Sequence, residues 1–159
     1  VNAQFYANFI KIGGAGATFG LALLCLFVAK SSQFKTLGKL AIGPAIFNIN
    51  EPLIFGMPIV LNPILMIPFI VSPVVMTTLT YIFMNIGLIP LTNGVNIPWT
   101  TPPIISGFLI SGWQGAVWQV IEMGLSALIF YPFFKLEDNK AYQIEMGQIE
   151  ADESGNVVA

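Results

Sequence analysis

The sequence predicts an all-α integral membrane fold with about three transmembrane helices and two re-entrant helical hairpins. Three observations lead to this prediction. The 159 residues are 55% hydrophobic and only 9% charged, with a mean hydropathy of +0.79, whereas roughly 25% charged residues is ordinary for a soluble domain. Several apolar stretches are long enough to cross a bilayer. Prolines and amides interrupt two of these stretches, which predicts broken helices.

The first apolar run, Ile12–Ala29, is uncharged and about as long as the shortest helices that span a bilayer, so it predicts the first span. Within it, Gly16 and Gly20 have the GxxxG spacing that allows close helix packing. The connection Lys30–Leu40 then holds three lysines. The positive-inside tendency places this connection in the cytoplasm, and an ordinary solvated loop is compatible with that placement.

Leu40–Val60 is apolar again, but three prolines interrupt it. Each proline removes a helical hydrogen bond and clashes with the preceding turn, which favours two half-helices over one continuous span. We expect one half-helix through Leu40–Phe47, a turn at membrane depth over Asn48–Pro52, and a second half-helix returning from Leu53. Such broken segments are tolerated only where they line a cavity in the protein, and in transporters they build substrate sites.

Pro63–Gly87 is long enough to span the bilayer, and its two internal prolines, at 68 and 73, predict kinks or a break. Leu91–Pro103 combines turn residues and prolines with a complete lack of charge. It therefore predicts a second re-entrant segment with Trp99 near its tip, which continues into a short helix over Ile104–Ile110.

The last spanning helix is expected from Trp113 to about Phe130, after a Ser-Gly pair, with Lys135 as a positive anchor at the membrane surface. Glu122 lies near the middle of this helix. Two interpretations of its carboxylate stay open: a hydrogen bond to a partner inside the bundle, or a role in transport beside an aqueous vestibule. Residues 136–159 are polar and acidic, and we expect a cytoplasmic tail that is partly helical at first and then disordered.

Composition excludes several classes of site and partner. The chain has no histidine and a single cysteine, Cys25, inside an apolar run, so the usual zinc ligand sets, a CxxC redox pair and an internal disulfide are not predicted. We expect no metal and no cofactor, and Cys25 is expected to serve packing. The sequence shows no basic footprint, so we expect no nucleic-acid partner.

Glu51 is the residue that most strongly predicts a functional site. Between Lys39 and Lys135 the only charged residues are Glu51 and Glu122. An ionisable group at membrane depth costs about 3 kcal/mol or more, so such a group is expected to face a protein-lined cavity. Amides precede Glu51 and a proline follows it, at the expected tip of the first hairpin.

Two motifs give the sequence a family resemblance. The first runs from Thr36 to Pro63 and contains Asn-Glu-Pro at 50–52, and the second is Pro-Trp-Thr-Thr-Pro-Pro at 98–103, followed by Ile-Ile-Ser-Gly. Both resemble the membrane permease component (enzyme IIC) of the bacterial phosphoenolpyruvate-dependent sugar phosphotransferase system, in its lactose/cellobiose/N,N'-diacetylchitobiose family. The resemblance covers residues 10–140. It implies that residues 1–135 are the C-terminal part of the substrate-binding transport domain of a larger permease, with residues 136–159 as its polar tail.

The resemblance implies a multi-pass protein of the bacterial cytoplasmic membrane, with its C-terminus in the cytoplasm. Such a permease binds a sugar, for example cellobiose, lactose or diacetylchitobiose, and translocates it for phosphorylation by a phosphocysteine on a cytoplasmic B component. The implied substrate-binding residues are Asn50, Glu51 and Trp99, and Glu51 is also the candidate catalytic base. The family's site uses a histidine as well, so this chain alone is not expected to hold a complete catalytic site. Membrane lipid and a second copy of the permease, docked through a preceding N-terminal part, are the other implied partners.

Other interpretations of these residues stay open. Glu51 could serve only to cap the returning half-helix, Trp99 could be an interfacial anchor, and Asn48 and Asn50 could mainly satisfy backbone groups of the turn. At the level of function, the alternatives are a proton-coupled secondary transporter without phosphorylation and a scaffold that does not transport.

Overall fold

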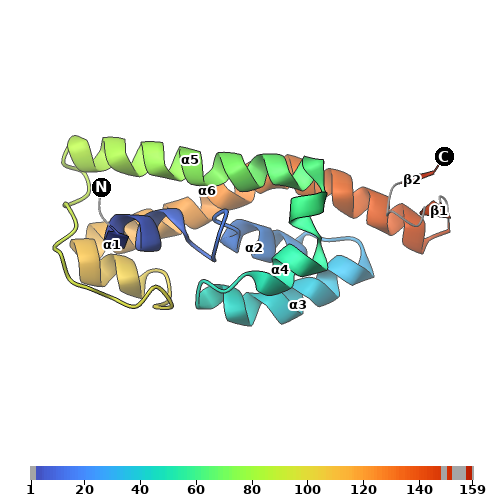
Figure 1. The fold of residues 1–159 in the computed structure, drawn as a ribbon, viewed down its shortest axis with the longest axis horizontal. Helices are drawn as coiled ribbons and strands as arrows, with labels where there is room; N and C mark the ends of the chain where they lie inside the picture. Colours follow the sequence, from blue (N-terminus) through green and yellow to red (C-terminus); the bar gives the residue numbers. More distant parts are fainter. Residues whose placement is uncertain (1–2, 148–149, 152–156, 159) are drawn as a thin grey trace.

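The computed structural model describes residues 3–147, 150–151 and 157–158. It is elongated and helical: two long helices, α5 and α6, run side by side, and shorter elements lie along one flank of the pair (Figure 1). The all-helical prediction is confirmed at this level, apart from one pair of two-residue strands. In chain order the elements are α1 (Ala3–Phe5), the π-helix η1 (Tyr6–Ile10), α2 (Phe19–Phe27), α3 (Ser32–Ile46), α4 (Glu51–Gly56), the 3-10 helix η2 (Ile59–Leu61), α5 (Pro63–Asn85), α6 (Ile105–Glu145), β1 (Glu150–Ala151) and β2 (Val157–Val158).

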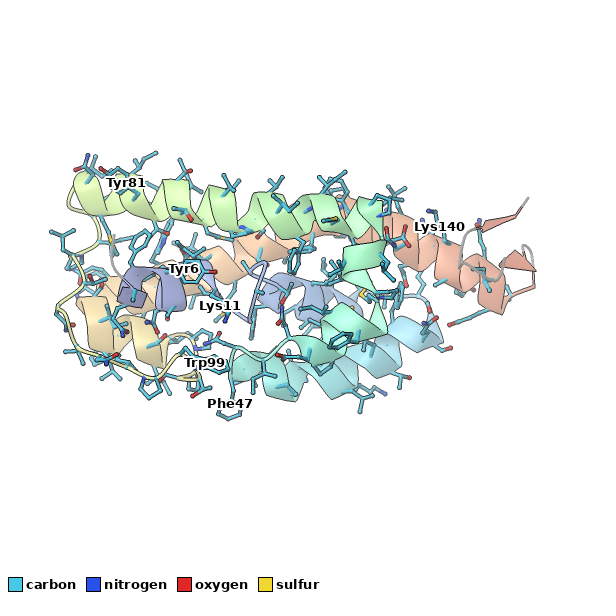
Figure 2. The ribbon with its side chains drawn as sticks, in the orientation of Figure 1. Tyr6, Lys11, Phe47, Tyr81, Trp99 and Lys140 are labelled. Atoms are coloured by element: carbon cyan, nitrogen blue, oxygen red, sulfur yellow. The ribbon has the colours of Figure 1, made fainter. Side chains whose placement is uncertain are left out.

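Helix α5 has the length and surface of a membrane span. Its N-terminus is capped by the Asn62 side chain, which accepts hydrogen bonds from the N–H groups of Ile64 and Leu65 at 3.0 and 3.4 Å. Its 23 residues extend about 35 Å, enough to cross the hydrocarbon core. Only 28% of its apolar window is buried, unlike the core helix of a soluble protein, and side chains such as Tyr81 point away from the bundle (Figure 2).

The helix limits differ from the prediction in two places. Of the kinks or break predicted at the prolines at 68 and 73, the break does not occur, because α5 continues through both of them; each proline removes one hydrogen bond and the flanking residues keep their helical geometry. Ile12–Ala29 is not a spanning helix, since α2 covers only Phe19–Phe27, about 14 Å. Gly13 and Gly14 before it have φ of +74° and +100°, left-handed geometry that interrupts a helix. Apolar content could not reveal this interruption.

The close packing predicted for Gly20 is confirmed. A Cβ at this position would run into the backbone of Ser126 and Ala127 on α6, and the Gly20 N–H donates to the Ser126 hydroxyl at 3.1 Å. Gly16, by contrast, lies in the turn before α2, against the ring of Phe69. Helices α2 and α6 therefore approach each other through a single glycine contact rather than through a GxxxG pair.

The expected helix–turn–helix around residue 50 is confirmed, with a longer first arm. Helix α3 ends at Ile46, Asn48 adopts a left-handed φ of +60°, and α4 begins at Glu51. The prediction that Lys30–Leu40 is a connecting loop is wrong, because α3 already begins at Ser32. Residues 32–39 have adequate helix propensity once their N-terminus is capped.

The Ser31 hydroxyl caps the N-terminus of α3 by accepting from the Phe34 N–H at 3.4 Å, and two carboxylates from the far end of the chain add to the cap. Asp138 on α6 accepts hydrogen bonds from the N–H groups of Lys30 and Ser31 at 2.8 and 3.0 Å. Glu145 accepts from the Ser31 hydroxyl at 2.7 Å and from the next two backbone N–H groups at 3.0 Å each. Carboxylates are favourable at a helix N-terminus because they complement its dipole. The end of α6 and the start of α3 therefore lie at the same end of the molecule.

The predicted helical start of the tail is confirmed, because α6 continues to Glu145. Beyond it, β1 and β2 pair antiparallel, which the expectation of disorder did not include. The remainder of that expectation falls on residues 148–149, 152–156 and 159, which lie outside the described residues.

Helix α6 is itself a hairpin of two unequal arms. Ser111 and Gly112 are non-helical, with φ of +71° at Gly112, and the first arm, 105–110, folds back onto the second. The side chain of Gln119 reaches across and accepts from the Gly107 N–H at 2.9 Å, a distance impossible for residues twelve apart in a straight helix. The predicted short helix and the break at the Ser-Gly pair are confirmed, whereas the second arm ends later than the predicted Phe130.

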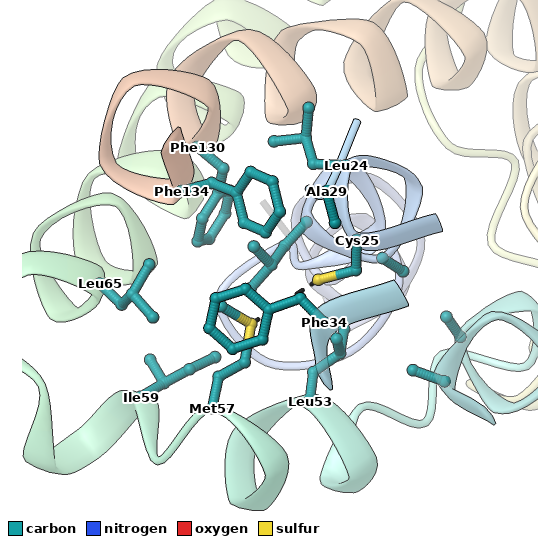
Figure 3. Packing of buried hydrophobic residues seen from close by; sticks show 14 residues of the cluster. Leu24, Cys25, Ala29, Phe34, Leu53, Met57, Ile59, Leu65, Phe130 and Phe134 are labelled. Carbon is teal, nitrogen blue, oxygen red and sulfur yellow. Dashed lines mark hydrogen bonds between the residues drawn. The ribbon is translucent and has the colours of Figure 1, made fainter. Parts of the chain in front are cut away.

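A buried apolar cluster joins α2, α3, α4 and α6 (Figure 3). The Cys25 thiol lies at its centre, fully buried, with its sulfur 3.7 Å from the sulfur of Met57. Leu53 on α4 and Phe130 on α6 are also fully buried there. Close van der Waals packing of such side chains is what holds helices together inside a membrane. The cluster fixes the α3–α4 hairpin against α6 and so positions the turn between its two arms.

Candidate functional site

Three irregular segments meet beside the tip of the α3–α4 hairpin: the turns over residues 11–18, the turn over 47–50, and the segment 98–103. They come from distant parts of the sequence. Turn hydrogen bonds such as Gly14 N–H to the Lys11 carbonyl and Thr101 N–H to the Pro98 carbonyl satisfy some of their backbone groups, and side chains bond others. The predicted residues Asn50, Glu51 and Trp99 all lie on these segments or directly beside them.

Asn48 holds the three segments together. Its Oδ1 accepts from the Gly13 N–H at 2.8 Å, and its Nδ2 donates to the carbonyl oxygens of Trp99 and Thr101 at 2.8 and 3.2 Å. The residue is 5% exposed. Its left-handed backbone is one that asparagine tolerates better than most side chains. Asn48 thus satisfies backbone groups, as the sequence allowed, but those groups belong to two other segments.

Asn50 supports the glycine-rich turns. Its Nδ2 donates to the Ala15 carbonyl at 2.6 Å and to the Thr18 hydroxyl at 2.8 Å. Thr18 in turn donates to the Gly13 carbonyl at 2.8 Å. A side chain at Gly14 would overlap Asn50, so the glycine permits this close approach. Among the described residues, no hydrogen bond reaches the Asn50 Oδ1, and the residue is 4% exposed.

Glu51 is exposed at the first position of α4, followed by Pro52. Its position in the first turn complements the helix dipole. Within the part of the chain that the structure describes, however, its carboxylate accepts no hydrogen bond, and the N-terminus of α4 has no side-chain cap. The capping interpretation therefore lacks the contact that would support it, and both carboxylate oxygens are open to a ligand.

Trp99 presents its indole at the surface while its backbone is fixed. The residue is 50% exposed, and Asn48 holds its carbonyl group. The Lys11 ammonium lies 5.1 Å from the centroid of the indole ring, within the range of a cation–π contact. Figure 2 shows Lys11 and Trp99 on the same side of the molecule, with Phe47 next to them. An aromatic face of this kind suits the apolar side of a sugar ring.

Glu122 lies apart from this junction, buried between α5 and α6. Its Oε1 accepts from the Thr80 hydroxyl at 2.6 Å, and the Trp118 indole N–H donates to the same hydroxyl at 2.9 Å. Its Oε2 has no partner among the described residues. This geometry favours the first interpretation of Glu122, a hydrogen bond inside the bundle that joins the two long helices.

An apolar cavity of about 560 Å³ lies between α5 and the second arm of α6. None of the predicted site residues lines it. Its walls include Leu79 and Phe83 on α5 and Trp113, Val117 and Ile121 on α6. The cavity offers a sugar almost no hydrogen-bond partners and is separate from the polar junction. In the described residues, no three histidine, cysteine or acidic side chains gather as they would around a metal ion.

Sequence reasoning missed Lys11 and Gln119. Lys11 is the only charged residue before Lys30, between two isoleucines, and that isolation was a usable signal. Gln119 accepts from the N–H groups of Ile104 and Gly107 and donates to the Asn8 carbonyl, at 2.5, 2.9 and 2.6 Å. A single glutamine in an apolar helix gives no indication of which segment it contacts.

The chain is similar in sequence to known proteins. Residues 1–73 match the family described as "Phosphotransferase system, EIIC". The chain is 51% identical to the lichenan permease IIC component of Bacillus subtilis (strain 168), over 89% of this chain and 32% of the relative. It is 49% identical to the cellobiose-specific EIIC component of Geobacillus stearothermophilus, over 88% of this chain and 32% of the relative.

A solved structure matches as well. The crystal structure of the transporter ChbC, the IIC component from the N,N'-diacetylchitobiose-specific phosphotransferase system, superposes with a TM-score of 0.90 at 46% identity, over 92% of this chain and 34% of that chain. The fold and the matches define a cytoplasmic-membrane component of a phosphotransferase system. The chain belongs to the EIIC family, in its lactose/cellobiose branch. It spans about a third of the length of the relatives it matches.

Proposed function

We propose that the chain is the C-terminal part of the substrate-binding transport domain of a sugar permease, which binds a β-linked disaccharide and translocates it for phosphorylation. The observation that carries this proposal is the junction itself. A carboxylate without a partner among the described residues, Glu51, and a half-exposed indole, Trp99, lie on segments that Asn48 joins. Polar groups that fix orientation, combined with an aromatic face, are typical of carbohydrate sites.

Each site residue has a distinct role in this proposal. Trp99 stacks on a sugar ring, and the Asn50 Oδ1 accepts a hydrogen bond from a sugar hydroxyl. Glu51 accepts the proton of the attacking hydroxyl, in the typical case the one on C6, as its oxygen bonds to the phosphorus of a phosphocysteine and the phosphorus–sulfur bond breaks. The phosphocysteine belongs to a cytoplasmic B component. A lactose-specific relative of Staphylococcus aureus (strain N315), 32% identical over 90% of this chain and 25% of the relative, is named an EIICB component.

The substrate class rests on the relatives. Their names specify lichenan, cellobiose and an oligo-β-mannoside. A site with few directional groups and one stacking face can accept several such sugars, and we propose cellobiose as the first sugar to test.

The proposed membrane arrangement has two spans, α5 and the second arm of α6, with two hairpins that enter the membrane without crossing it. The α3–α4 hairpin enters from the cytoplasm and the 98–110 segment enters from outside. Lysines occur in α3 and in the last part of α6. Both groups lie at one end of the molecule, the end at which Asp138 and Glu145 cap α3. The positive-inside tendency places that end, and the C-terminus, in the cytoplasm. Dimerisation would use surfaces of the permease outside this chain.

A transport assay on the full-length permease tests the proposal. Vesicles that contain the permease are supplied with labelled cellobiose, with or without the phosphorylated B component, and the accumulated label is analysed. We expect sugar phosphate, and only with the phosphorylated B component. Accumulation of free sugar driven by a proton gradient would instead establish a secondary transporter, and vesicles that take up no sugar under any condition would favour the scaffold.

A further inference from the structure

We propose that Lys11 is a positioning residue for Trp99: its ammonium holds one face of the indole, so that the sugar stacks on the opposite face. This inference rests on the proposed function of the same site. The contact that carries it is the ammonium nitrogen of Lys11, 5.1 Å from the centroid of the Trp99 ring. A cation over the face of a tryptophan is attracted by the negative charge of its π-system.

The backbone of Lys11 is held in place on both sides. Its N–H donates to the Tyr6 carbonyl at 3.2 Å, and its own carbonyl accepts from the Gly14 N–H at 3.0 Å. Lys11 is also the C-cap of η1. Its side chain therefore leaves a fixed point, and less conformational entropy is lost when it orders over the indole.

The turn that contains Lys11 also holds the backbone of Trp99, through Asn48. Two residues after Lys11, the Gly13 N–H donates to Asn48, and Asn48 donates to the Trp99 carbonyl. The backbone of Trp99 is thus attached to the turn through Asn48, while its ring is attached through Lys11. Two attachment points at opposite ends of a residue fix the plane of its ring, whereas the backbone contact alone leaves the side-chain torsions free.

Lys11 has no competing partner for its charge among the described residues. The salt bridge that they form joins Lys140 and Glu137, at the end of α6. Lys11 is half-buried, between two buried isoleucines, and a charge in such surroundings needs compensation. The indole face supplies part of it. A half-exposed indole with one face taken by a cation has one face for stacking, and the position of Lys11 therefore selects which face the sugar uses.

The test compares three variants of the full-length permease in detergent, with cellobiose as the probe and calorimetry as the readout. Lys11→Met keeps the length of the side chain and removes the cation, and we expect it to weaken binding about two- to fivefold, the range of a cation–π contact at a partly exposed site. Lys11→Arg keeps a cation that stacks on aromatic rings, and we expect affinity within twofold of the parent. Lys35→Met, an exposed lysine on α3, is the matched control and should not change binding.

A fourth variant, Trp99→Ala, separates this inference from the proposed function. If Trp99→Ala abolishes binding but Lys11→Met leaves it unchanged, the role of Lys11 is overturned and the sugar site stands. If Trp99→Ala binds cellobiose as the parent does, the stacking role in the proposed function fails, and the Lys11 inference fails with it. Equal weakening in Lys11→Arg and Lys11→Met would also overturn it, because a purely structural loss does not depend on whether the replacement carries a positive charge. The tryptophan emission of Lys11→Met, measured against a Trp99→Phe reference, should shift even without sugar.

Discussion

At the scale of single residues, the site depends on two asparagine side chains that bond neighbouring segments of the chain. Asn48 and Asn50 lie on either side of one residue. Both side chains bond the turns over residues 11–18, and Asn48 also bonds the segment 98–103. Glu51, directly after them, makes no such contact within the described residues. Buried polar groups must be satisfied, and the two asparagines satisfy loops that have no helix to do so. The neighbouring carboxylate is thereby presented from a rigid position.

Replacement of Asn48 tests this arrangement. Asn48→Ala removes three hydrogen bonds, one buried and two partly buried, and also places alanine at a φ of +60°. We expect a loss of about 2–4 kcal/mol in the free energy of unfolding, and weaker sugar binding. Asn48→Gly removes the same hydrogen bonds but tolerates the backbone geometry, so it should lose about 1 kcal/mol less. Unfolding in detergent measures both. An Asn48→Ala variant as stable as the parent would mean that Asn48 does not hold the segments together.

At the scale of elements, the two helical hairpins are stabilised by different interactions. The α3–α4 hairpin ends in a left-handed asparagine and is fixed by the apolar cluster around Cys25. The α6 hairpin depends on two glycines, Gly107 and Gly115, whose backbones touch: a Cβ at either would lie 2.5–2.7 Å from the carbonyl oxygen of the other. Small residues at such a contact let helical arms approach closely in a membrane.

The glycine contact can be tested with a matched pair on the same helix. Gly115→Ala should lower the free energy of unfolding by about 1–3 kcal/mol, because the new methyl group overlaps backbone that cannot move aside. Gly124→Ala meets nothing within 4 Å, and it should be neutral or stabilising by up to about 1 kcal/mol, since alanine is the better helix former. Equal stability of the two variants would contradict the packed hairpin.

The cap at the start of α3 gives a pH-dependent prediction. Glu145 lies beyond the apolar part of α6, and hydrogen bonds from the Gln33 N–H, the Ser31 hydroxyl and the Ser32 N–H lower its pKa to about 2, from an ordinary value of 4.5. Because the folded state lowers this pKa, its contribution is complete above about pH 4.5 and declines as the pH falls towards 2. The parent should therefore be more stable than Glu145→Gln at pH 7, and this difference should shrink at pH 3.

The control for this comparison is Glu137→Gln. This change removes the same charge from the same helix, but the carboxylate pairs only with Lys140, three residues away. The pair is only partly exposed, with 43% of the Lys140 side chain and 14% of the Glu137 side chain accessible. A helical pair three residues apart contributes only about 0.2–0.5 kcal/mol, so the variant should follow the parent closely at both pH values. A stability difference between the parent and Glu145→Gln that does not change with pH would contradict the cap.

At the scale of the whole molecule, the sequence predicted where the chain turns better than it predicted what the turns touch. The turn before Glu51 and the break at Gly112 follow from local chemistry, because asparagine and glycine permit geometry that other residues resist. The partner of Asn48 lies 51 residues away, at Trp99, and no local pattern encodes it. The span predicted over Ile12–Ala29 was wrong because a glycine-rich turn packed inside protein is as apolar as a helix.

Some residues of the candidate site could be predicted from the sequence, and others could not. Glu51 could be predicted from charge alone, since isolated carboxylates in apolar segments are expensive, and Asn50 and Trp99 came from motif resemblance. Lys11 could not be assigned a role without the structure, because its partner is a ring 88 positions further along the chain. The junction is a product of tertiary packing: α2, α3, α4 and α6 share one buried cluster, and three irregular segments meet beside it.

The most direct test of the central claim, that this junction presents Glu51 to a sugar for phosphorylation, is the rate of cellobiose phosphorylation by Glu51→Gln. The measurement uses the full-length permease in vesicles with the phosphorylated B component. We predict a loss of about 10²–10⁴-fold, the usual contribution of a general base, with normal insertion in the membrane and cellobiose binding within about tenfold of the parent. Phosphorylation at the parent rate in Glu51→Gln would contradict the account and would leave Glu51 as a structural residue at the start of α4.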